Sequence, residues 1–251
     1  MNLSTFLFWL HEAYLSFRVT SSEVSDVESA VVEALSAILI KGQALKVEAG
    51  FGGTTISSSG EDSIVTYGDL FSVEKILPVG SFYERTKLVL PDEFDFNIKI
   101  NVGEIDIHQG CRPGRVKVTF ESGRPKSRRD LSELFSKMMH VALKSLTDAE
   151  KMITRETGTL HMLSVSGSSC GVPSLTLNWE GANRVFKITV DIMPSIPCTD
   201  TFVEEIVKDD NFPLVFHQLV KDLGCFLVPK LKCVLAGHVF MFPLLKQSFI
   251  S

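Results

Sequence analysis

Apolar residues recur at helical spacing in two long segments of the chain. Over residues 24–41, a valine, leucine or isoleucine returns every three or four positions until Gly42, an expected C-cap. Ser25 and Glu28 form the S-x-x-E pattern of a helix N-terminus. Residues 127–146 repeat the same apolar spacing. Both segments are therefore predicted to be amphipathic helices.

Other segments alternate apolar and polar residues, the two-residue period of a strand with one buried face. These segments are residues 93–100, 104–108, 115–120, 174–179 and 184–192. The last two flank the short polar turn EGAN, which predicts a hairpin. Weaker patterns predict helices over residues 3–17 and 202–223 and a loop over residues 51–62. The order of helices and strands predicts an α+β domain built around a mixed sheet.

Composition narrows the class of protein. A chain of 251 residues with 45% hydrophobic residues suits one large domain, or a core with a small appendage. The net charge of −5 excludes a wholly basic nucleic-acid-binding protein. The five cysteines form no C-x-x-C pair and suit reduced thiols, which predicts a cytoplasmic location. The sequence predicts neither a signal peptide nor a membrane-spanning segment.

Two acidic residues interrupt the strand pattern of residues 93–100. Residues two apart in a strand point to the same face, so Glu93 and Asp95 are expected to present their carboxylates side by side. Adjacent anions repel unless a cation neutralises them, and hard oxygen ligands favour Mg²⁺ or Mn²⁺. Asp191, at the end of a neighbouring predicted strand, is the best candidate for a third ligand. Three such carboxylates could hold two ions for in-line nucleotidyl transfer.

A Gly-Ser pair precedes these acids. Gly80 would let the backbone approach a phosphate closely, and the Ser81 hydroxyl could hydrogen-bond to phosphate oxygens. Taken separately, such a pair is usually a simple turn, and an acid-x-acid strand is usually a solvated sheet face. Their order and spacing favour the functional interpretation.

The segment LPVGSFYERTKLVLPDEFDFNIKI resembles the signature of the cyclic GMP-AMP synthase-like receptors, in the Mab-twenty-one nucleotidyltransferase group, and so do KITVDIMPSIP and CFLVPK. The resemblance implies a polymerase-β-like nucleotidyltransferase core flanked by helices, with an N-terminal spine helix. It implies that Glu93, Asp95 and Asp191 bind the metal ions and act in catalysis. It also implies that Gly80, Ser81 and Lys230 contact nucleotide.

The chain departs from the family pattern after Lys230. In place of a W-R-x-S-F-S-like strand and a helical lobe it has an apolar run, interpreted as a divergent tail. The family's zinc-binding His and Cys cluster has no counterpart, so no zinc is predicted. The one tight basic cluster is RPKSRRD, which is either a solvated loop or a contact to double-stranded RNA or DNA. The side chains that would make this contact are Arg124, Lys126, Arg128 and Arg129.

Two functional hypotheses follow. In the first, the protein is an innate immune sensor: nucleic acid activates it to make a cyclic dinucleotide from ATP, GTP or both. In the second, it is a truncated or regulatory relative that binds nucleic acid or a partner without turnover. Homodimer formation is compatible with both. The expected domains are N-terminal helices over residues 1–42, a nucleotidyltransferase core over 43–232 and the divergent tail over 233–251.

Overall fold

The computed structural model describes residues 2, 4–6, 19–47, 66–84, 90–103, 105–109, 115–120, 128–167, 173–182, 184–198, 225–229 and 239–243. The chain divides into two compact units. Unit 1 comprises Met1–Gly42, Ile76–Asn97 and Ser136–Ile192. Unit 2 comprises Gln43–Lys75, Ile98–Phe135 and Met193–Ser251.

The long helix of unit 1 is α2, Ser21–Gln43, which confirms the helix predicted over residues 24–41. Its N-terminus is earlier than predicted, because the Thr20 hydroxyl accepts a hydrogen bond from the Glu23 amide at 3.1 Å. The predicted capping box of Ser25 and Glu28 was therefore wrong, since both residues lie inside the helix.

Gly42 does not end α2 as predicted. It is a buried helical residue, and a Cβ added to it would lie 2.8 Å from the Cγ of Met138. Met138 belongs to α5, Arg128–Ser145, which confirms the helix predicted over residues 127–146. The glycine thus allows close packing of α5 against the C-terminal turn of α2.

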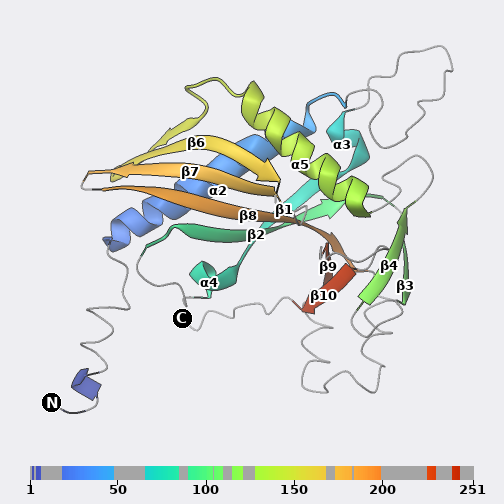
Figure 1. Ribbon diagram of the computed structural model, residues 1–251, viewed down its shortest axis with the longest axis horizontal. Coiled ribbons are helices and arrows are strands. Elements are labelled where there is room, and N and C mark those ends of the chain that lie inside the picture. The colour runs from blue at the N-terminus through green and yellow to red at the C-terminus, as the bar shows by residue number, and fades with distance from the viewer. Residues whose placement is uncertain are drawn as a thin grey trace. The chain divides into compact units, whose positions relative to one another are not determined.

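The sheet of unit 1 is built around an antiparallel series of strands (Figure 1). These are β5 (Met152–Thr154), β6 (Gly158–Gly167), β7 (Pro173–Gly181) and β8 (Val185–Pro197). The predicted hairpin is confirmed, and its turn is closed by a hydrogen bond of 2.9 Å from the Gly181 amide to the Arg184 carbonyl.

Beyond β8, the sheet continues into β2 (Glu93–Asn101), which pairs with β8 and with β1 (Ser72–Val79). The arrows of β2 and β8 point the same way in Figure 1, so the sheet is mixed. The fold class is α+β, and the arrangement is compatible with a nucleotidyltransferase-like core.

One face of this sheet is apolar and the other is polar. Alternate residues of β7 and β8 are buried, and the apolar side of α2 is buried with them. The buried side chains in these elements include Leu175, Leu177, Trp179, Ile188, Val190, Val27, Val31, Leu35 and Ile38. Figure 1 shows α2 lying across β6, β7 and β8. The intervening residues of β7 and β8 therefore form the opposite, polar face.

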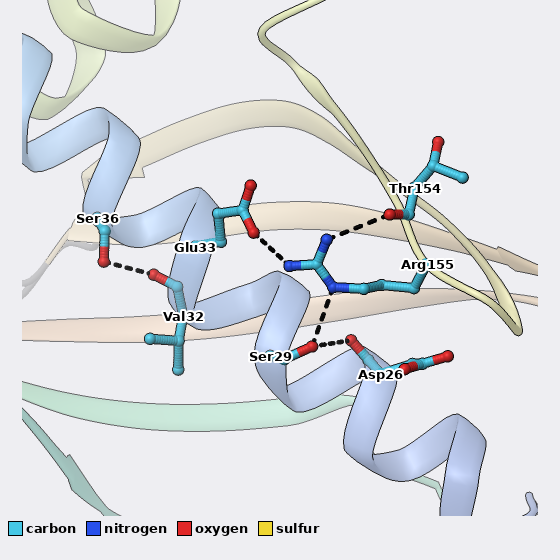
Figure 2. Close-up of polar contacts among 7 residues, drawn as sticks. All are labelled: Asp26, Ser29, Val32, Glu33, Ser36, Thr154 and Arg155. Carbon is cyan, nitrogen blue, oxygen red and sulfur yellow. Dashed lines mark hydrogen bonds and ion pairs between the residues drawn. The ribbon is translucent and has the colours of Figure 1, made fainter.

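Polar contacts attach α2 to the turn between β5 and β6 (Figure 2). The Arg155 guanidinium pairs with the Glu33 carboxylate and donates to the Ser29 hydroxyl at 3.1 Å. Asp26 accepts from both the amide and the hydroxyl of Thr157, at 2.9 and 2.7 Å. These contacts fix the position of α2 along the sheet.

Unit 2 has its own set of paired strands. Its sheet order is β3-β4-β10-β9, with β3 Ile105–Gln109, β4 Arg115–Phe120, β9 Cys225–Pro229 and β10 Val239–Pro243. The strands predicted over residues 104–108 and 115–120 are confirmed as β3 and β4. β10 lies in the segment that was interpreted as a divergent tail, and it pairs with β9 and β4.

Unit 2 also contains the short helix α3, Tyr67–Leu70, whose N-cap Thr66 exchanges hydrogen bonds with Asp69. Residues 4–6 of the predicted helix 3–17 are helical, and the rest of it lies outside the described residues. The predicted loop 51–62 and the predicted helix 202–223 lie entirely outside the described residues. In the described ranges, no helix is both long and apolar enough to cross a membrane.

Candidate active site

The Gly-Ser turn packs directly against an acidic side chain of β2. Gly80 opens the four-residue helix α4, Gly80–Tyr83, with a φ of 81°, in the left-handed region. A Cβ added to Gly80 would lie 2.7 Å from the Cγ and 2.8 Å from the Cβ of Asp95, and it would overlap the Oδ2 atom. Only glycine allows this backbone to turn beside the carboxylate.

An aromatic cluster holds the turn in place. The Phe82 ring lies 4.4 Å from that of Phe94, and the Tyr83 ring lies 5.6 Å from that of Phe96, between ring centroids. Burial raises the pKa of the Tyr83 hydroxyl, and the charge of Glu28 raises it further. Phe94 and Phe96 flank Asp95 in the strand, so the same rings that anchor α4 direct Asp95 to the opposite face.

The three predicted acidic ligands share one face of the sheet of unit 1. Glu93 and Asp191 are exposed and Asp95 is half-buried, whereas the residues that alternate with them are buried. The amide of Thr189 donates to the carbonyl of Asp92 at 2.9 Å, so β8 lies beside the start of β2. Since the two strands run in the same direction (Figure 1), Asp191, two residues after Thr189, lies beside the stretch of β2 just after Asp92, which carries the acids.

The described residues contain no group of three or more His, Cys, Asp or Glu side chains close enough together to hold a metal ion. The structure therefore brings the three acids to one face without drawing their carboxylates together. Three anions repel one another when no cation lies between them.

The donor atoms on this face are nevertheless of the kind that hard divalent cations prefer. They are carboxylate oxygens, and the Gly80 backbone lies directly against the Asp95 carboxylate where a Cβ would collide. Glu93, Asp95 and Asp191 are the residues that would hold a Mg²⁺ or Mn²⁺ ion here, and their role as ligands stays a prediction.

A serine for which the sequence predicted no role lies opposite Asp191 in the sheet. Ser174 of β7 is the residue directly opposite Asp191 in the β7–β8 register. Ser166 of β6 is in turn opposite Ser174, and its hydroxyl donates to the Ser174 carbonyl at 3.4 Å. The alternating pattern SLTLNW places Ser174 on the polar face. Its position opposite Asp191 follows only from the register with β8.

Some of the predicted site residues lie outside the described part of the chain. Lys230, Arg124 and Lys126 are among them. Arg128 and Arg129 begin α5, and their side chains are likewise outside the description. Their predicted contacts to nucleotide and nucleic acid stay predictions.

Comparison with known proteins places this site in context. No protein-family model matches the chain. A cyclic GMP-AMP synthase from Sus scrofa is 30% identical over 119 residues, which is 47% of this chain and 23% of the synthase. The chain thus matches about a quarter of that relative's length. The similarity indicates a distant relationship to cyclic GMP-AMP synthase, of the nucleotidyltransferase type.

Proposed function

We propose that the protein is a metal-dependent nucleotidyltransferase that makes a cyclic dinucleotide from ATP, GTP or both. The observation that carries the proposal is the packing of the Gly80 turn against the Asp95 carboxylate. The relationship to a cyclic GMP-AMP synthase supports the choice of product class. Innate immune signalling in the cytoplasm is the corresponding biological role.

The proposed chemistry follows from the closeness of two anions, a bound phosphate and the Asp95 carboxylate. A turn with a glycine at positive φ can offer backbone amides to a phosphate, and the Ser81 hydroxyl adds another donor. A phosphate bound there would lie beside the Asp95 carboxylate and be repelled by it. A divalent cation held by Asp95 would offset this repulsion, so phosphate binding and metal binding are expected to depend on each other.

Each acidic residue has a defined part in this proposal. Glu93, Asp95 and Asp191 would hold two Mg²⁺ or Mn²⁺ ions, and such ions would supply activation of the attacking hydroxyl and stabilisation of the leaving pyrophosphate. Gly80 leaves room for the phosphate, and Ser81 binds and orients it. Lys230 provides a further contact to the nucleotide.

Double-stranded RNA or DNA is the proposed activator. It would be bound by the basic cluster of Arg124, Lys126, Arg128 and Arg129 through its phosphates. α2 is a poor surface for this purpose, because it carries Glu23, Asp26, Glu28 and Glu33 but only one basic residue, Lys41. The activated protein could also act as a homodimer.

The test is to incubate the chain with labelled ATP and GTP, Mg²⁺ or Mn²⁺, and double-stranded RNA or DNA, and then to resolve the nucleotide products. An Asp95→Ala variant serves as control. A cyclic dinucleotide that disappears in the variant supports the proposal. A product of equal amount in both proteins would overturn the role of Asp95.

A second candidate function is a regulatory relative that binds nucleotide or a partner without turnover. The absence of a convergent acidic group within the described ranges favours it. Folded protein that binds Mg²⁺ and ATP but forms no product with either activator would support this alternative.

A further inference from the structure

We propose that Ser174 is a positioning residue for Asp191, and that its hydroxyl orients the Asp191 carboxylate toward the metal ions. This inference rests on the proposed function. It concerns a residue of β7, the strand on the other side of β8 from the acids of β2.

The strand register places the two side chains together. Ser174 and Asp191 are directly opposite in the antiparallel β7–β8 pair, where Cβ atoms lie about 4.5–5.5 Å apart. Both point to the polar face, because the next pair along, Leu175 and Val190, is fully buried on the other face. Ser174 is half-buried and Asp191 is exposed.

The chemistry of serine suits this position. A hydroxyl can donate one hydrogen bond to a carboxylate oxygen and so fix the rotation of the carboxyl group, leaving the other oxygen for a metal. It does this without a positive charge, whereas a lysine would neutralise Asp191 and compete with the ion. The basic residue on this face of β8 is Lys187, which pairs with Asn178, well along the strand from Asp191.

Asp191 is thus placed between two kinds of neighbour. On one side β2 brings Glu93 and Asp95, which repel it until a cation binds. On the other side β7 brings the Ser174 hydroxyl, which can restrain it beforehand. Thr176, opposite Thr189 on the same face, has no acidic cross-strand neighbour on β8 and provides a matched control.

The experiment is a Mn²⁺ titration of the full chain in the presence of ATP, followed by electron paramagnetic resonance of free Mn²⁺. Ser174→Ala is expected to weaken Mn²⁺ binding by about tenfold, the lower end of the usual effect of removing a group that orients a metal ligand. Ser174→Thr, which keeps the hydroxyl, should restore binding. Thr176→Val should bind Mn²⁺ as the wild type does.

A purely structural role for Ser174 would give a different pattern. Ser174→Ala would then lower the melting temperature and leave the Mn²⁺ affinity unchanged, and that result would overturn the inference. An Asp191→Asn variant separates this failure from failure of the proposed function. If Asp191→Asn binds Mn²⁺ as well as the wild type does, or if the wild type binds none, the proposed metal site is wrong. The inferred role of Ser174 is then wrong as well.

Discussion

Gly80 and Asp95 occupy adjoining space: a Cβ on the glycine would lie 2.7 Å from the Cγ of the aspartate. The two residues come from different elements, the turn after β1 and the strand β2, and an aromatic cluster beneath them keeps these elements together. The turn that we propose to bind phosphate and the carboxylate that we propose to bind metal are therefore parts of one local structure. This relationship makes the site testable at single residues.

Gly80→Ala should both destabilise the protein and weaken the proposed Mn²⁺ binding. The left-handed backbone costs a residue with a Cβ about 1–2 kcal/mol, and displacement of the Asp95 carboxylate adds to that cost. Urea unfolding measures the stability, and Mn²⁺ titration measures metal binding at the site. Gly167→Ala is the control, since its Cβ would meet the Ser136 hydroxyl at an ordinary 3.5 Å and its backbone has no positive φ. Equal losses of stability and of Mn²⁺ binding in the two variants would show that the turn at Gly80 has no particular need for glycine.

Metal ions should stabilise the wild-type protein through its acids. A ligand at 100 times its dissociation constant adds about 2.7 kcal/mol to the free energy of unfolding. Mg²⁺ or Mn²⁺ with ATP should therefore raise the melting temperature of the wild type but not of Asp95→Asn or Asp191→Asn. Without metal, these variants should be no less stable than the wild type, because each removes a repelling charge. A metal-induced shift of the same size in all three proteins would contradict the assignment of these ligands.

The regular elements could be predicted from sequence because their signals are local. Apolar spacing gave the helices of residues 24–41 and 127–146, and alternation gave the β7–β8 hairpin. The helix start was missed because Thr20 and Glu23 also form a T-x-x-E pattern, one turn earlier. Two such patterns compete, and the bonds of the Glu23 and Val24 amides to the Thr20 hydroxyl and carbonyl show that the helix starts at the earlier one.

The site was only partly predictable, for a different reason. Glu93 and Asp95 share a face by the period of one strand, which sequence alone specifies. The position of Ser174 beside Asp191 depends on the register of two strands, and the approach of Gly80 to Asp95 depends on packing between β1 and β2. Neither relationship is encoded within a single segment.

Asp26 should contribute more to stability than Glu33, although both bind the same turn. Asp26 is half-buried and accepts two hydrogen bonds from Thr157, so Asp26→Ala leaves two donors unsatisfied, at roughly 1–3 kcal/mol. Glu33 forms an exposed ion pair with Arg155, and such pairs contribute about 0–1 kcal/mol. Urea unfolding of the two alanine variants gives the comparison. A larger loss for Glu33→Ala would mean that the ion pair, and not the Thr157 contact, holds α2 in place.

The pH dependence of stability should differ in sign between two glutamates. Burial raises the pKa of Glu28 in the folded state, so the folded protein binds its proton more tightly than the unfolded chain does. The resulting penalty is present at neutral pH and disappears as the pH falls through the folded pKa toward the unfolded one. Glu28→Gln should therefore stabilise the protein at pH 7, and the gain should vanish in acid.

Glu150 provides the opposite case. Hydrogen bonds from the amide and hydroxyl of Thr147 lower the pKa of Glu150, so its contribution is favourable above its unfolded pKa and is lost as the pH falls through the folded pKa. Glu150→Gln should then be less stable than the wild type at pH 7, with the difference shrinking in acid. Urea unfolding of both variants from pH 3 to pH 8 measures the two trends. Parallel curves for Glu28→Gln and the wild type would show that Glu28 is solvated in the folded protein.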